Sequence, residues 1–198
     1  MRNSKENNKI KNFKIDEEDR KEKLFLFCEK LIRNKNNNID SKELETYASE
    51  IILIYNNIFN DDNLRRKATH IIRELAKRYD IILDLVMENA RQYANAQYID
   101  DAFPYSPNSF DVLAEIGKGN KRVISFLKDT VLNNYGIPRW NAIEALCQLD
   151  DPLADRIIIE IIQGKYPPKQ LYFENDLSHI ENIKGKSFIQ RFTDKKYV

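Results

Sequence analysis

Apolar side chains recur every three or four residues along most of the chain, the spacing that places them on one face of an α-helix. The clearest example runs from Arg139 to Gly164, where apolar stripes lie on both sides of an Asp-Asp-Pro corner at 150–152. An aspartate can cap the free N–H groups at a helix start, proline suits the first turn, and glycine commonly follows the last turn. This stretch therefore predicts two helices joined by a tight corner, the second of which ends at Gly164.

The same periodicity predicts helices along the rest of the chain. They are expected over residues 17–33, 41–59, 64–75, 79–98, 176–183 and 187–192, with Asp40 or Ser41 capping the second. All five glycines and all six prolines lie at or after Pro104, so the first half of the chain contains no strong helix breaker. No strand-like alternation accompanies these helical patterns, so we expect an all-α fold.

Parts of the chain repeat the register of the Arg139 stretch. In the segment 64–75, Arg65 corresponds to Arg139. The apolar positions that follow Arg65 lie at the same distances along the chain as the apolar positions that follow Arg139. A fainter copy covers 106–116, where Ser109 stands in place of the expected alanine, and a second helix opens after it at Val123. Helical units that recur at such spacings are typical of a solenoid, in which each unit buries its apolar side against its neighbours.

The pattern Arg-x-x-Ala-x-x-Ala-Leu-x-x-Leu-Asp-Asp-Pro-x-Ala over residues 139–154 resembles a HEAT repeat of the short bacterial, PBS-lyase type. The resemblance implies a right-handed α-α superhelix of roughly four to five helix pairs. It also implies that the arginine position, Arg65 or Arg139, ties one helix to its neighbour. We expect residues 21–198 to form a single solenoid domain with atypical capping ends, and residues 1–20 to form a polar, disordered tail.

The composition of the 198 residues is that of a globular protein, with 42% hydrophobic and 32% charged residues. A formal net charge of +1 favours neither nucleic acid nor an anionic membrane. The start of the chain has no apolar leader, and no run is long enough to span a membrane. Two isolated cysteines indicate reduced thiols and a cytoplasmic protein, and the abundance of Asn, Lys and Ile is typical of an AT-rich bacterial genome.

No set of residues with catalytic spacing emerges from the sequence. Cys28 and Cys147 lie inside apolar patterns, which favours buried structural thiols over nucleophiles. His70 and His179 are not spaced as metal ligands, and the glycines around Lys118 do not follow a strand as a phosphate loop would. We therefore expect no enzymatic activity, no cofactor and no metal.

In a solenoid of this kind the second helices of successive units line the concave face. Their polar positions carry both signs of charge, and those expected to bind a partner are Arg91, Arg122, Lys128, Asp129, Arg156 and Glu160. The loop 98–107 is aromatic, acidic and rich in proline, and contributes Tyr98, Asp100, Asp101, Phe103 and Tyr105 as further binding candidates. The alternative for this loop is that Phe103 and Tyr105 only fill the gap between two repeats.

The leading hypothesis is a non-catalytic interaction module, or scaffold, that holds a protein partner on its concave face. One version is an inhibitor or immunity-type protein that masks a bacterial protein. A second hypothesis, from the resemblance, is an enzyme-assisting protein similar to bilin-lyase subunits. A third is nucleic-acid binding, as in HEAT-like alkylpurine glycosylases, which the mixed charge disfavours. A small-molecule ligand is left open by the sequence.

Overall fold

A computed structural model describes residues 3–33, 39–56, 62–96, 108–166 and 173–193, and every regular element in these ranges is an α-helix. The helices are α1 (Asn3–Arg33), α2 (Ser41–Asn56), α3 (Asp62–Ala76), α4 (Asp80–Asn95), α6 (Asn108–Ile116), α7 (Lys121–Asn133), α8 (Gly136–Gln148), α9 (Pro152–Ile162), α10 (Phe173–Lys184) and α11 (Lys186–Thr193). The all-α fold class expected from the periodicity is confirmed for these residues.

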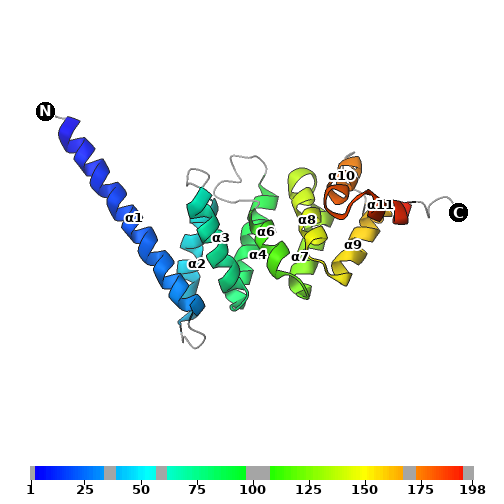
Figure 1. The fold of residues 1–198 in the computed structure, drawn as a ribbon, viewed down its shortest axis with the longest axis horizontal. Helices are drawn as coiled ribbons and strands as arrows, with labels where there is room; N and C mark the ends of the chain where they lie inside the picture. The colour runs from blue at the N-terminus through cyan, green and yellow to red at the C-terminus, as the bar shows by residue number, and fades with distance from the viewer. Residues whose placement is uncertain (1–2, 34–38, 57–61, 97–107, 167–172, 194–198) are drawn as a thin grey trace.

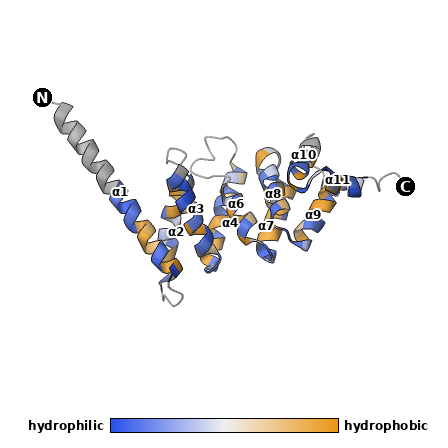
Figure 2. Cartoon of the chain, viewed as in Figure 1, coloured by the Kyte–Doolittle hydropathy of each residue, from blue (hydrophilic) through white to orange (hydrophobic). Residues whose placement is uncertain are grey.

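The helices form an elongated array of two rows (Figure 1). In the first row α1 contacts α3, α3 contacts α6, α6 contacts α8, and α8 contacts α10. In the second row α2 contacts α4, α4 contacts α7, α7 contacts α9, and α9 contacts α11. Hydrophobic and hydrophilic residues alternate around the helices (Figure 2), so each helix buries one stripe against its neighbours.

Local capping signals explain where several helices begin and end. Asp151 is the N-cap of α9, and its Oδ1 accepts from the backbone N–H of Leu153 at 2.8 Å. Asp40 accepts from the N–H of Glu43 at 3.3 Å, which makes it the cap of α2. Gly164 follows α9 with φ 69°, a left-handed conformation that glycine adopts without a steric penalty. The predicted corner of the Arg139 stretch is therefore confirmed.

Helix α1 begins at Asn3, so the expected start near Glu17 is wrong. The polar segment before Glu17 contains no glycine or proline, and nothing in its backbone chemistry stops a helix from continuing through it. Figure 1 shows the N-terminal part of α1 extending away from the other helices, whereas Leu24, Phe25, Cys28 and Leu31 of its C-terminal part are buried. The division into a tail at 1–20 and a domain at 21–198 stays a prediction.

Arg139 connects four segments at the centre of the C-terminal half. Its side chain is buried, and its Nε and Nη2 donate to Asp176 Oδ2 of α10 at 3.0 and 2.8 Å. Its Nη2 also donates to the carbonyl of Tyr166 at 2.8 Å, and its Nη1 donates to the carbonyl of Val131 at the end of α7. The arginine that begins the repeat pattern therefore ties α8 to neighbouring segments.

A buried polar cluster explains why a serine replaces alanine at position 109. The hydroxyl of Ser109 on α6 donates to Asn89 Oδ1 of α4 at 2.8 Å. The same oxygen accepts from Asn56 Nδ2 of α2 at 3.4 Å. Because a buried amide without a partner destabilises the fold, this serine stabilises the packing of α2, α4 and α6.

Candidate functional site

The exposed polar positions of the second row contact one another from helix to helix. Arg122 of α7 forms an ion pair with Asp84 of α4, and its Nη1 lies 3.8 Å from Asp80 Oδ1. Asp84 lies one helical turn after Asp80, so both carboxylates face the same neighbour. These side chains form a charged surface that continues from α4 to α7.

Aromatic side chains extend this surface along the second row. The guanidinium of Arg91 pairs with Glu88 and lies 5.5 Å from the centre of the Phe126 ring. Further along, Lys128 Nζ lies 5.3 Å from the centre of the Tyr166 ring. The Tyr166 hydroxyl donates to Glu160, so these partly buried side chains connect α7, α9 and the segment after α9. Cation–π contacts of this kind hold long basic side chains in place.

A groove of about 360 Å³ opens between α2 and α4 on the same row. We call it the α2–α4 groove. Ile81, Leu85 and Met87 provide its apolar lining, and its polar lining consists of Glu45, Asp84, Glu88 and Arg91. In the sequence, Glu45 is an acidic residue near the start of its helix, and the apolar periodicity of α4 assigns Ile81, Leu85 and Met87 to the core. Only the packing of α2 against α4 leaves this part of the stripe partly open.

The residues predicted to bind a partner fall into three groups in the structure. Arg91, Arg122, Lys128 and Glu160 take part in the contacts along the second row. Asp129 and Arg156 are exposed on α7 and α9. The loop candidates Tyr98, Asp100, Asp101, Phe103 and Tyr105 lie outside the described residues. Their contribution to binding stays a prediction.

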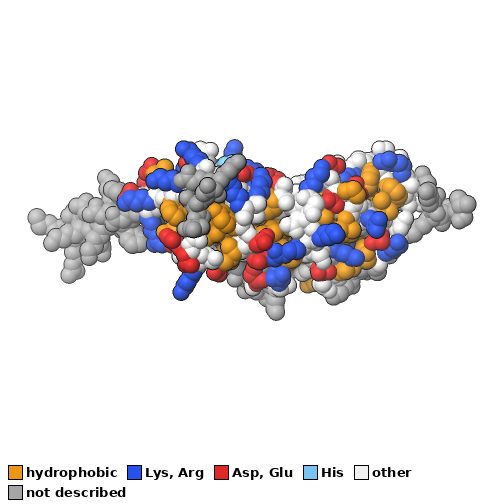
Figure 3. All heavy atoms as spheres, turned by 90° about the horizontal axis from the view of Figure 1, so that it is seen from below, with side chains coloured by type: hydrophobic (Ala, Val, Ile, Leu, Met, Phe, Trp, Pro, Cys, Tyr) orange, Lys and Arg blue, Asp and Glu red, His pale blue; other side chains and the backbone are white. Residues whose placement is uncertain are grey.

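Positive and negative side chains are interspersed on the edge of the array that contains the α3–α4, α6–α7 and α8–α9 corners (Figure 3). At the corners, Lys118 Nζ lies 2.8 Å from Asp150 Oδ2. Asp151 Oδ2 accepts a hydrogen bond from the backbone N–H of Gly119 at 2.9 Å. These contacts lower the pKa of both aspartates, through the Lys118 hydrogen bond at Asp150 and backbone hydrogen bonds at Asp151. The aspartate pair therefore joins neighbouring corners and caps α9.

Both histidines have partners within the array. Nδ1 of His70 lies 2.8 Å from Nη2 of Arg73, and His179 of α10 pairs with Glu144 of α8 and stacks on Trp140 at 5.1 Å between ring centres. Within the described ranges, no group of three or more His, Cys, Asp and Glu is arranged to hold a metal ion. These partners orient both histidine rings against neighbouring side chains.

Both cysteines are buried, and burial raises the pKa of each thiol to about 12. The thiolate is the reactive form, so at pH 8 we expect Cys28 and Cys147 to react with Ellman's reagent at least about 100-fold more slowly in the native protein than in urea. The release of thionitrobenzoate measures both rates. A thiol that reacts in the native protein as fast as in urea would contradict the packing of its helix.

Neither the known protein-family models nor the curated proteins match this chain. Across the part of the chain that the structure describes, no helix combines the length and apolar character needed to cross a membrane.

Proposed function

We propose that the chain is a HEAT-like, right-handed solenoid that binds a protein partner on the concave face formed by its second row of helices. The α2–α4 groove is the observation that carries this proposal. It combines an apolar lining of Ile81, Leu85 and Met87 with charged groups around it, the composition of a protein-binding surface with a desolvated centre and a polar rim.

The charges of the groove define the chemistry of the partner. Three carboxylates, from Glu45, Asp84 and Glu88, lie among the lining residues. Asp84 is paired with Arg122 and Glu88 with Arg91, which leaves the carboxylate of Glu45 to face a partner. A partner segment with apolar side chains flanked by lysine or arginine complements this arrangement, whereas a phosphate backbone would be repelled. The groove therefore supports a protein partner over a nucleic acid.

The contacts of the second row extend the binding face toward α9. Arg122 and Asp84 already hold each other across two helices, so their side chains are ordered before a partner arrives. Ordered side chains lose less conformational entropy on binding than mobile ones. A face built in this way suits a protein that holds or masks another protein, as an inhibitor or an immunity protein does.

The test is the capture of a partner from the native organism by the wild-type chain and by two charge-reversal variants. The groove variant carries Glu45→Lys and Glu88→Lys, and the control carries Glu22→Lys and Glu181→Lys, both on exposed positions away from the groove. We expect the groove variant to lower the affinity for the captured protein about tenfold or more, and the control to retain it. Binding affinity is measured by isothermal titration calorimetry with the purified partner.

Two outcomes would contradict the proposal. The first is equal affinity of the groove variant and the control, which would place the partner elsewhere. The second is that no protein binds stably and the purified chain itself modifies a substrate, which would assign the chain to an enzymatic class.

A further inference from the structure

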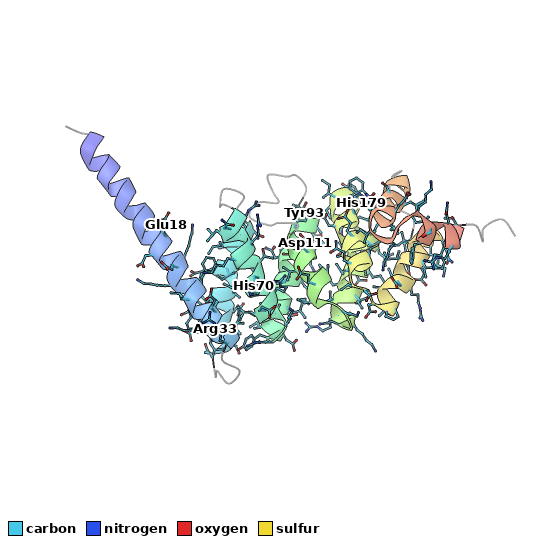
Figure 4. The ribbon with its side chains drawn as sticks, viewed as in Figure 1. Glu18, Arg33, His70, Tyr93, Asp111 and His179 are labelled. Atoms are coloured by element: carbon cyan, nitrogen blue, oxygen red, sulfur yellow. The ribbon has the colours of Figure 1, made fainter. Side chains whose placement is uncertain are left out.

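A second concave site lies between the first-row helices α3 and α6, and has a volume of about 520 Å³. We call it the α3–α6 cleft. One wall is formed by Arg65, Arg66, His70 and Arg73 of α3, and the other by Asp111 and Glu115 of α6. Figure 4 shows His70 and Asp111 on these two neighbouring helices. The site lies on the opposite row from the α2–α4 groove and is independent of the protein-binding proposal.

Helical spacing produces the two walls. Arg66, His70 and Arg73 are four and three residues apart, so they lie on one face of α3. Asp111 and Glu115 are four residues apart and share one face of α6. The packing of α3 against α6 places the two faces on either side of the cleft. One wall therefore carries guanidinium groups and the other carboxylates.

One end of the cleft is neutralised within the protein. Arg73 forms an ion pair with Glu115 across the cleft and also contacts the ring of His70. Arg73 and Glu115 are near the C-terminal ends of α3 and α6, so their ion pair joins the two helices at this end.

Two charged side chains of opposite sign in the cleft, Arg66 and Asp111, have no counter-ion in the described part of the chain. Arg66 is exposed and forms no hydrogen bond or ion pair with the described residues. The same is true of Asp111, whose carboxyl pKa is raised by partial desolvation and by repulsion from Glu144 of α8 and from Glu115. Negative charge is therefore crowded on this wall, and a positive group placed there would be stabilised.

We propose that the α3–α6 cleft binds a small zwitterion, with its carboxylate against Arg66 and its ammonium against Asp111. A guanidinium binds a carboxylate through two parallel hydrogen bonds, and a carboxylate accepts readily from an ammonium. A polyanion is disfavoured because the second wall repels it, and a polycation is disfavoured by the first. A small amino acid that carries one carboxylate and one ammonium satisfies both walls at once.

The probe is 6-aminohexanoate, titrated into the ¹⁵N-labelled chain while amide chemical shifts are recorded. Hexanoate and hexylamine, which each retain one charge, are the matched ligands. We expect 6-aminohexanoate to shift amides of α3 and α6 with a dissociation constant of about 1 mM, and each singly charged ligand to bind about tenfold more weakly.

The variants Arg66→Gln and Asp111→Asn are each expected to weaken 6-aminohexanoate binding about tenfold. Arg191→Gln and Asp19→Asn make the same chemical changes at exposed positions of α11 and α1, outside the cleft lining, and are expected to leave binding unchanged. Asp111→Asn removes a carboxyl that its surroundings disfavour in the charged form, so its melting temperature at pH 7 should equal or exceed that of the wild type.

Three results would overturn the proposal. If hexanoate bound as tightly as 6-aminohexanoate, the ammonium group would add no affinity, and the cleft would act only as a basic surface that binds a carboxylate. Unchanged binding by the folded Arg66→Gln and Asp111→Asn variants would place the ligand elsewhere. An absence of amide shifts in α3 and α6 up to saturating ligand would show that the cleft takes no small zwitterion, and would leave the partner proposal for the second row untouched.

Discussion

Replacing Arg139 with methionine is expected to lower the free energy of unfolding by about 3–5 kcal/mol, the usual cost of breaking a buried ion pair by removing one partner. Arg139 and Asp176 are both nearly inaccessible to solvent, with side-chain exposures of 2% and 0%. Methionine fills much of the space but donates no hydrogen bond. The carboxylate of Asp176 and the carbonyls of Val131 and Tyr166 would then lose their donor inside the protein.

For a chain of this length, such a loss corresponds to a decrease in melting temperature of roughly 6–20 °C. Urea unfolding followed by circular dichroism at 222 nm measures the free energy. Arg156→Met is the control, because Arg156 is exposed on α9 and its loss leaves no buried group without a partner. Equal destabilisation by Arg139→Met and Arg156→Met would contradict the structural role of Arg139.

The double variant Arg139→Met, Asp176→Leu separates the ion pair from the packing around it. Removing both charges leaves no buried carboxylate behind, and apolar replacements of buried ion pairs are often neutral or stabilising. We expect the double variant to recover at least half of the stability that Arg139→Met loses. Failure to recover would show that the hydrogen bonds of Arg139 to the carbonyls of Val131 and Tyr166 provide most of its contribution.

Replacing Gly117 with alanine is expected to destabilise the protein by about 2–3 kcal/mol, because the corner between α6 and α7 has no room for a methyl group. A Cβ at this position would lie 2.6 Å from the carbonyl oxygen of Leu113, 2.6 Å from Val123 and 2.9 Å from Leu149. Leu149 belongs to the corner between α8 and α9, so the added carbon would push these two neighbouring corners apart. Urea unfolding measures the loss.

Gly119→Ala is the matched control two residues away. Gly119 has φ 73° and open space around its Cα, so alanine there meets backbone strain alone, at a cost of about 1 kcal/mol. We expect the Gly117 variant to be clearly less stable than the Gly119 variant. The reverse order would mean that Leu149 and Val123 move aside and that the contact between the two corners is looser than the structure shows.

The candidate site was predictable in part. The polar positions of the second helices could be counted from the sequence. In the structure, contacts along the second row involve Arg91, Arg122, Lys128 and Glu160. Glu45 could not be assigned to that surface from the sequence. It lies on α2, and only the packing of α2 against α4 brings it beside the polar residues of α4. The basic run 65–73 was visible, but its position opposite Asp111 depends on how α3 packs against α6.

The sequence by itself determined the helices of this protein and most of their ends. Periodicity, the cap at Asp151 and the glycine at 164 act within one or two helical turns, where the backbone hydrogen bonds are local. Only the tertiary structure decided which helices share a surface. The partner of Arg139 is 37 residues away, and the α2–α4 groove and the α3–α6 cleft each arise between separate helices. Their geometry depends on interhelical packing, which local propensity does not specify.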